Sequence, residues 1–314
     1  MEWFSDNETL IQAALAGAIL AYSFQIAMRA GVFTLAGVGF WAIGGYSTAY
    51  LVTEREWMTA PAILAGIVIS GVIGLLLALV LGRLRSLYLA MATVAFVLLV
   101  QIVAINWEAV TGGAGGMFGI PVTVSTWQLL VIVAVTSVAL FFFERGARGR
   151  TIEAMRLDEQ VAMSVGINVV RERDLIFVLS SMMAALSGGI AAMMFNTLAP
   201  EQAGFGLIVD TLMMVVIGGA AAWWGALVGA FIVTWLPEIL RFTGDYRGIV
   251  EGLIVVLVVV YAPEGFVGLV RRVTVFITGR RKPPGTPFAD DAPTVLPDVQ
   301  HAQPEAALPE GAER

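Results

Sequence analysis

Residues 60–82 read APAILAGIVISGVIGLLLALVLG, a run that contains no charged side chain. The hydrocarbon core of a bilayer requires about 20 predominantly apolar residues of helix, because no water is present there to satisfy exposed backbone groups. The run therefore predicts a helix that spans a membrane, and the same test applies to the rest of the chain.

Similar apolar runs recur through most of the sequence. They lie at about 9–28, 31–52, 87–106, 127–143, 174–195, 206–220, 224–240 and 249–270. We therefore expect an all-α integral membrane protein with about eight to nine transmembrane helices. The segment 206–240 decides the count, because its break at 218–225, GGAAAWWG, is short and uncharged. It is either two spans or one broken element, since irregular backbone at membrane depth is tolerated inside protein or beside a wet cavity.

The composition agrees with a membrane protein and excludes several kinds of chemistry. Of the 314 residues, 58% are hydrophobic and only 13% are charged, whereas soluble domains carry about 25% charged residues. The chain has no cysteine, and its one histidine is His301. Disulfides, thiolate metal sites and a Ser-His-Asp triad therefore lack their usual parts. We expect transport rather than enzymatic activity, with no metal and no cofactor bound by this chain.

The basic residues predict the orientation, because lysine and arginine favour the cytoplasmic side of a membrane protein. With the N-terminus outside and nine spans, the inside segments up to Lys282 hold fourteen of these residues and the outside segments hold three, Arg55, Arg241 and Arg247. An eight-span count places both ends on one side and spoils this bias. We therefore expect a multi-pass protein with its N-terminus outside and its C-terminus in the cytoplasm.

The sequence divides into two regions. Residues 1–282 contain all the apolar runs and form a transmembrane domain, with a cytoplasmic loop at about 144–173. Residues 283–314 hold seven of the twelve prolines, several acids and few large apolar side chains. This composition predicts a disordered cytoplasmic tail.

The cytoplasmic loop contains the stretch RTIEAMRLDEQVAMSVGIN at 150–168. Thr151 can cap a helix here, and Gly166 stands where a glycine ends one. The apolar positions at about helical spacing are Ile152, Met155 and Val161. The stretch predicts one short amphipathic helix, which either rests on lipid or docks to a soluble cytoplasmic partner. Its mixture of acids and arginines and its modest apolar stripe favour docking.

This stretch resembles the coupling-helix region of ABC importer permeases. The general signature matches only at Ala162 and Gly166, but the variant found in branched-chain amino acid permeases of the LivM type is much more similar. The residues that match this variant are Arg156, Asp158, Glu159, Ala162, Gly166, Ile167 and Asn168. The resemblance implies that these residues couple the chain to an ATPase.

Other blocks resemble the same family in the same order, from about residue 15 to residue 272. They are 37–46, where Gly45 replaces the family's alanine, then 87–96, 111–116, 214–219 and 261–265. We add Asp210 from the residues alone, because an ionisable residue at membrane depth is costly and is a functional candidate. The candidates for the translocation path are Gly44, Gly45, Tyr46, Thr93, Thr111, Gly112, Gly113, Asp210, Gly218 and Gly219.

The resemblance implies one permease subunit of an ATP-driven importer in the bacterial inner membrane. Its partners would be a second permease in a heterodimer, two cytoplasmic ATPase subunits that bind the ATP, and an external binding protein, with no nucleic acid. The substrates implied are branched-chain or other hydrophobic amino acids, moved by alternating access. The alternatives are a permease of this family for urea or short amides and an ion-coupled secondary transporter. The sparse charge within the apolar runs counts against ion coupling.

Overall fold

The computed structural model describes residues 7–82, 84, 87–121, 124–219, 223–241, 247–261, 265–266 and 268. Each of the nine apolar runs contains a helix in these residues, which confirms the all-α membrane fold. The helices are α2 (Glu8–Arg29), α3 (Gly37–Thr53), α4 (Thr59–Leu81), α5 (Leu87–Asn106), α7 (Thr126–Arg145), α10 (Val169–Phe195), α11 (Phe205–Gly218), α12 (Gly225–Ile239) and α13 (Arg247–Tyr261). The tail predicted at 283–314 lies outside the described residues.

Five of these helices are long and apolar enough to cross a membrane by length and composition: α2, α4, α5, α7 and α10. The helix α10 is the longest described, with 27 residues, or about 40 Å at 1.5 Å per residue. It packs against α2, α3 and α4 and therefore stands inside the helix bundle.

Glycines set how closely α3 and α10 approach each other. A Cβ atom added at Gly188 on α10 would overlap the carbonyl oxygen of Trp41 on α3, and one added at Gly44 would overlap the backbone of Ala185. Small residues at such crossings allow the two backbones to touch, and van der Waals contact then replaces the hydrophobic effect that lipid cannot supply.

The segment 206–240 forms two helices, α11 and α12, of 14 and 15 residues. Each is about 21–23 Å long, which is shorter than the hydrocarbon core of about 30 Å. A Cβ atom added at Gly218 would overlap the carbonyl oxygen of Gly225, and one at Gly229 would overlap that of Met214. The two helices are therefore separate elements that pack closely through glycine.

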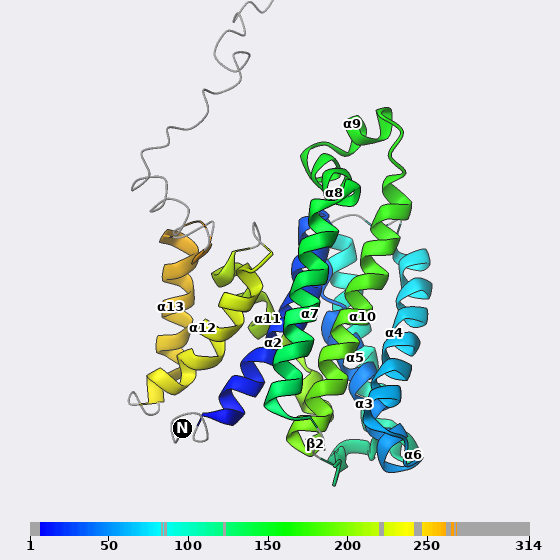
Figure 1. Ribbon diagram of the computed structural model, residues 1–314, viewed down its shortest axis with the longest axis vertical. Helices are drawn as coiled ribbons and strands as arrows, with labels where there is room; N and C mark the ends of the chain where they lie inside the picture. Colours follow the sequence, from blue (N-terminus) through cyan, green and yellow to red (C-terminus); the bar gives the residue numbers. More distant parts are fainter. Residues whose placement is uncertain are drawn as a thin grey trace, which may run out of the picture. The chain divides into compact units, whose positions relative to one another are not determined.

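Short elements occupy the two ends of the helix bundle (Figure 1). At one end lie α8 (Ala147–Leu157) and α9 (Glu159–Ser164), and we call it the α8–α9 end. At the other, α6 (Glu108–Thr111), η1 (Gly113–Gly115) and η2 (Pro200–Ala203) accompany the strands β1 (Met117–Phe118) and β2 (Thr197–Leu198). The strands pair antiparallel, Met117 with Leu198 and Phe118 with Thr197, and we call this the ribbon end.

Candidate coupling and translocation sites

The loop at the α8–α9 end holds two helices rather than the single one predicted. Helix α8 begins at Ala147, before the predicted cap at Thr151, and the chain turns extended at Asp158, with φ −155° and ψ 117°. The Asp158 carboxylate accepts hydrogen bonds from the backbone N–H groups of Gln160 at 2.8 Å and Val161 at 3.1 Å. Aspartate is a preferred N-cap and competes with the helix for backbone donors. Asp158 therefore ends one helix and begins the next.

The end of α9 confirms the helix stop expected at Gly166. Gly166 has φ +87°, and its N–H donates to Met163 O at 3.0 Å, while the N–H of Ile167 donates to Ala162 O at 3.1 Å. This pair of bonds is the Schellman motif, which needs a residue in the left-handed conformation. Asn168 then caps α10 by accepting a hydrogen bond from Arg171 N at 3.1 Å. The Gly-Ile-Asn block is thus a turn that joins two helices.

A small apolar cluster holds this turn together. It consists of buried Met155, Ala162 and Val169, with Ile167 packed against them. Ala162 is only 1% exposed, so a larger side chain would not fit at this position without displacing its neighbours. Ile152 is also buried, but Val161 is 58% exposed. The predicted apolar stripe is therefore wrong at Val161, because the break at Asp158 rotates α9 relative to α8.

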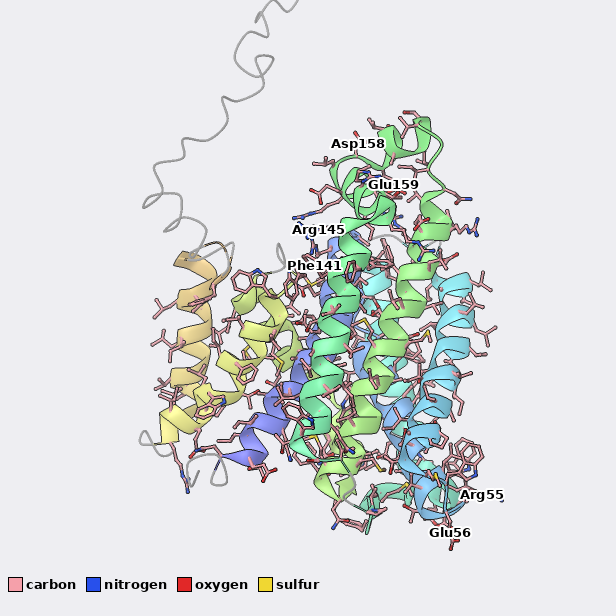
Figure 2. The ribbon with its side chains drawn as sticks, viewed as in Figure 1. Arg55, Glu56, Phe141, Arg145, Asp158 and Glu159 are labelled. Carbon is pink, nitrogen blue, oxygen red and sulfur yellow. The ribbon has the colours of Figure 1, made fainter. Side chains whose placement is uncertain are left out.

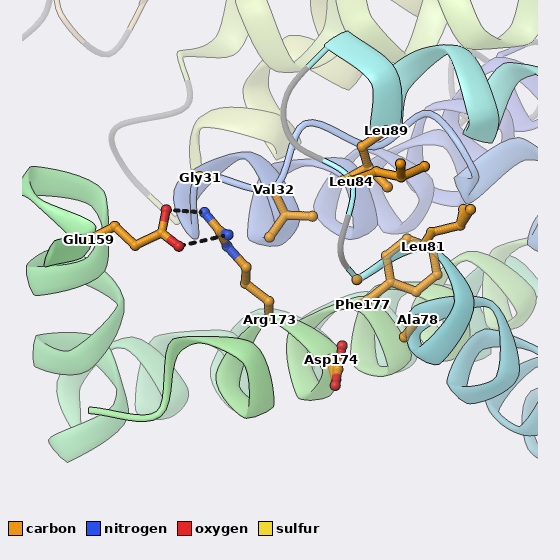
Figure 3. A pocket seen from close by; sticks show the side chains of 11 residues that line it. Gly31, Val32, Ala78, Leu81, Leu84, Leu89, Glu159, Arg173, Asp174 and Phe177 are labelled. Atoms are coloured by element: carbon orange, nitrogen blue, oxygen red, sulfur yellow. Dashed lines mark hydrogen bonds and ion pairs between the residues drawn. The ribbon is translucent and has the colours of Figure 1, made fainter. Parts of the chain in front are cut away.

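An ion pair fixes α9 to α10. Arg173 Nη1 and Nη2 donate to Glu159 Oε1 and Oε2 at 3.1 and 3.0 Å, with side chains 27% and 31% exposed. The pair is visible in Figure 3. A bidentate guanidinium–carboxylate pair constrains orientation as well as distance. Together with the Asn168 cap, this ion pair holds α9 in a fixed position relative to α10.

The outer surface of this turn carries exposed apolar side chains. We call this the tip surface, and it consists of Leu157, Val161, Met163 and Val165, which are between 50% and 79% exposed. Arg156 is exposed beside it. Asp158 and Glu159 lie at this end of the molecule, and Arg55 and Glu56 lie at the opposite end (Figure 2). The tip surface has no partner within the described part of the chain, as a docking element requires.

At the ribbon end, the predicted Thr-Gly-Gly block builds a tight loop. The hydroxyl of Thr111 donates to Ala104 O at 2.6 Å and accepts from Gly113 N at 3.3 Å. Gly112 and Gly113 have φ +74° and +69°, a region that L side chains seldom adopt. The left-handed conformation of these glycines turns the chain so that β1 can pair with β2.

The candidates on α3 and α5 also hold neighbouring backbone in place. Tyr46 is buried, and its hydroxyl donates to Leu198 O of β2 at 3.4 Å. Thr93 is fully buried and accepts a hydrogen bond from Leu35 N at 3.0 Å. Gly45 lies opposite Leu198 and Gly188. Each of these residues has a local structural role, and their place on a translocation path stays a prediction.

An apolar pocket of about 650 Å³ lies among α3, α4, α5 and α6. It brings together two of the sequence candidates, Tyr46 and Thr111, whereas Thr93, Asp210, Gly218 and Gly219 are not part of its lining. Its aromatic lining residues Tyr50, Phe96 and Trp107 were not among the candidates. Tyr50 lies on α3, Phe96 on α5 and Trp107 between α5 and α6, so no local pattern joins them.

Asp210 lies on a different surface, on the exposed side of α11 with Phe205 and Val209. The adjacent Thr211 is fully buried and bonds to Leu207 O at 2.6 Å. A carboxylate at membrane depth is very unfavourable against lipid, and such groups face protein or water. This face of α11 is therefore unsuited to contact with lipid tails.

Comparison with known proteins supports one family. The model of the family described as branched-chain amino acid transport system / permease component matches residues 8–259. LivM, a permease protein of the high-affinity branched-chain amino acid transport system of Salmonella typhimurium, is 28% identical over 278 residues, which cover 77% of this chain and 65% of that protein. LivM of Escherichia coli is 26% identical over the same coverage.

A probable ABC transporter permease of Escherichia coli, YphD, is 27% identical over 166 residues, which cover 50% of this chain and 48% of that protein. This chain spans about 65% of the length of the LivM relatives. No solved structure matches it significantly. The match to the family model nevertheless extends from α2 into α13 and includes both ends of the bundle. The chain belongs to the family of branched-chain amino acid transport permease components.

Proposed function

We propose that this chain is a transmembrane permease subunit of an ATP-driven importer for branched-chain or other hydrophobic amino acids. It would work in the bacterial inner membrane with a second permease, two ATPase subunits that bind and hydrolyse ATP, and an external binding protein. The observation that carries this proposal is the tip surface, which is exposed, apolar and joined firmly to the central helix α10.

The α8–α9 end suits the transmission of a force from outside the chain. The Glu159–Arg173 pair and the cap at Asn168 join α9 to α10, and α10 packs along α2, α3 and α4. A displacement of the tip surface would therefore be carried into three other helices rather than absorbed in a flexible loop. Alternating access requires such a rigid connection between the ATPase and the helix bundle.

The charge at the two ends supports placing the α8–α9 end in the cytoplasm. Arg145, Arg148, Arg150 and Arg156 all lie in or beside α8 and are exposed. The ribbon end, in contrast, holds Arg55 together with Glu54 and Glu56. Positive charge on the cytoplasmic side is the general rule for membrane proteins, so in this proposal the ribbon end would face the external binding protein.

The proposed substrate class rests on the family and on the apolar pocket. A pocket whose lining includes Tyr50, Phe96 and Trp107 favours a hydrophobic amino acid over urea or a short amide, because it offers few hydrogen-bond partners for a polar solute. The exposed face of α11 with Asp210 would then meet the second permease or the water-filled path between the two subunits.

Co-purification of the full chain from its native membrane tests the proposal. We expect the ATPase subunits and a second permease to accompany the intact chain. Val161→Glu introduces a charge into the tip surface and should remove the ATPase subunits, while the second permease remains. Val170→Glu is the matched control, because Val170 is 60% exposed at the same end but lies outside the tip surface.

The result with the intact chain separates the proposal from its rivals. If the intact chain purifies alone and still supports concentrative uptake of leucine, the importer proposal is wrong. Asp210 would then be the first residue to test for ion coupling, by measuring whether Asp210→Asn removes the dependence of uptake on the proton gradient.

A further inference from the structure

A second pocket lies at the α8–α9 end, on the side of the bundle where α7 and α10 run next to each other (Figure 1). Its volume is about 210 Å³, and its lining comes from α7, α8 and α10. Both α7 and α10 pack on α2, but within the described residues they make few direct contacts with each other. Leu175 in the lining is 43% exposed, so the pocket opens at the outer surface of the bundle.

The lining of this pocket crosses the boundary of the hydrocarbon core. Helix α7 has 20 residues, which is about 30 Å and matches the thickness of that core. Helix α10 ends at the ribbon end, where α7 begins, and with its 27 residues it extends about 10 Å further than α7. Leu179 and Met182 of the lining therefore lie within the core. Arg148 and Glu172 lie beyond it, at the level of the lipid headgroups.

Arg148 places a positive charge at this headgroup level. Its side chain is exposed, and its guanidinium lies over the Phe143 ring, 5.8 Å from the ring centroid. Such a contact keeps the cation next to the apolar part of the pocket. Among the described lining residues Glu172 is the only acid, and the adjoining stretch 144–150, ERGARGR, holds three arginines and one glutamate. The charge at this rim is therefore positive on balance.

The start of α8 adds a second attraction for an anion. Its N-cap is Gly146, which has no side chain to accept hydrogen bonds from the first turn, and that turn contains no acid. A helix N-terminus carries partial positive charge that acids usually complement, whereas α8 has Arg148 and Arg150 there. Backbone N–H groups at the start of a helix form a common binding site for phosphate. An anion at the rim would therefore be attracted by the helix end and by Arg148 together.

We propose that this pocket binds an anionic phospholipid. The phosphate would meet Arg148 and the start of α8, and one acyl chain would lie against Leu175, Leu179 and Met182. Basic pockets between transmembrane helices are a known type of site for anionic headgroups. The bound lipid would join α7 to α10, which few direct contacts hold together. The proposal requires only that the bundle lies in a membrane, so it does not depend on the proposed substrate or on an ATPase.

Native mass spectrometry of the full chain in mild detergent tests the binding. Phosphatidylglycerol is titrated, and the fraction of chain that carries one lipid gives the dissociation constant. Phosphatidylcholine with the same acyl chains should bind about fivefold more weakly, because its headgroup has no net charge. Glycerol 3-phosphate, which has the phosphate without the acyl chains, should not displace the lipid at tenfold excess. Equal binding of the two lipids, or displacement by glycerol 3-phosphate, would overturn the proposal.

Two variants that remove the same charge locate the site. Arg148→Gln should weaken binding of phosphatidylglycerol about fivefold, the usual effect of one basic residue near an anionic headgroup, and should leave phosphatidylcholine unchanged. Arg145→Gln is the control, because Arg145 lies at the same end (Figure 2) with its guanidinium 4.6 Å from the centroid of the Phe141 ring and is not part of the lining. If both variants weaken binding equally, the attraction belongs to the whole basic end, and the proposal is wrong.

Two further variants test the other parts of the lining. Glu172→Gln removes the acid at the rim and should strengthen binding of phosphatidylglycerol. Leu179→Trp fills the apolar part and should weaken binding of both lipids, whereas Leu99→Trp, on an exposed position of α5, should change neither. Each variant must elute as a single species of the same size before it is compared. Tight binding that survives in Leu179→Trp would show that the acyl chain lies elsewhere, and it would overturn the proposal.

A partner protein is the rival occupant of this pocket, and the same measurement on the chain purified with all its partners decides between them. If the lipid is the occupant, the complex should bind phosphatidylglycerol, and Arg148→Gln should weaken that binding as it does in the chain alone. If the preference for phosphatidylglycerol is absent from the complex, a partner covers the pocket and the proposal is wrong.

Discussion

The two ends of the helix bundle use glycine in the same way but are held together differently. At both ends a glycine in the left-handed conformation shapes a turn, Gly166 at one and Gly112 at the other. The ribbon end is tied across the bundle, since β1 pairs with β2 and Gln101 of α5 donates to Pro200 O at 3.2 Å. The α8–α9 end is instead held by helix caps, one small cluster and one ion pair.

This difference indicates different mechanical roles. Backbone pairing between segments about 80 residues apart joins α5, α7, α10 and α11 at the ribbon end, so that end resists separation of the helices. The α8–α9 turn makes its main polar contacts with α10, the helix that follows it in the chain. It can therefore move with α10 as a unit, and its contacts can be altered without unfolding the bundle.

The largest expected effect is at the ribbon end. Gly116 has φ +79°, and an added Cβ atom would overlap the carbonyl oxygen of Leu198, so Gly116→Val should both strain the loop and separate β1 from β2. We expect a loss of stability of about 3–5 kcal/mol, of which the left-handed conformation accounts for about 1–2 kcal/mol. Thermal unfolding in detergent, followed by the loss of the monodisperse peak, measures it.

Gly119→Val is the matched control for Gly116→Val. Gly119 has φ +73°, but an added Cβ atom there meets nothing within 4 Å. It should show the conformational strain alone and therefore a much smaller loss of stability. Equal losses in the two variants would mean that the ribbon contact contributes little, and the contrast between the two ends would fail.

A smaller effect is expected at the opposite end. Gly166→Ala places a side chain at φ +87° in open space, so the cost is the strain of about 1–2 kcal/mol alone, confined to the turn. Global stability should change little, while ATP-driven uptake should fall because α9 loses its defined direction. Gly146→Ala serves as control, since Gly146 has φ −78°. Uptake that falls equally in both variants would contradict a specific role for the turn at Gly166.

The helices were predictable because a bilayer imposes an uninterrupted apolar run on each of them. The segment 206–240 stayed ambiguous, because the stretch between α11 and α12 contains no charged residue that would mark a loop. The stop at Gly166 was also predictable from local chemistry. The break at Asp158 was missed, although an aspartate ahead of Glu159 and Gln160 is a typical N-cap signal, because the apolar spacing continued across it.

The candidate site was less predictable than the fold. Motif residues such as Thr111, Gly112 and Thr93 could be named from the sequence, but not their hydrogen bonds, which join elements that only the folded chain brings together. The lining of both pockets comes from three or more segments, so no single window of sequence contains it. The Glu159–Arg173 pair likewise depends on the direction that the Asp158 and Gly166 turns give to α9.

The smallest expected change in stability comes from Glu159→Gln, and it gives the sharpest distinction between stability and coupling. The pair is about a third exposed, and ion pairs in such settings contribute less than about 1 kcal/mol. The melting temperature should therefore hardly move. If α9 transmits motion through this pair, uptake per ATP hydrolysed should nevertheless fall several-fold, because the link between α9 and α10 is weakened. The exchange of both residues, Glu159→Arg with Arg173→Glu, should restore part of the coupling. The coupling is measured in proteoliposomes with the complete transporter. If uptake per ATP hydrolysed is no higher in the double variant than in Glu159→Arg or Arg173→Glu alone, the pair only supports local packing. The α8–α9 end would then be held by its turns alone.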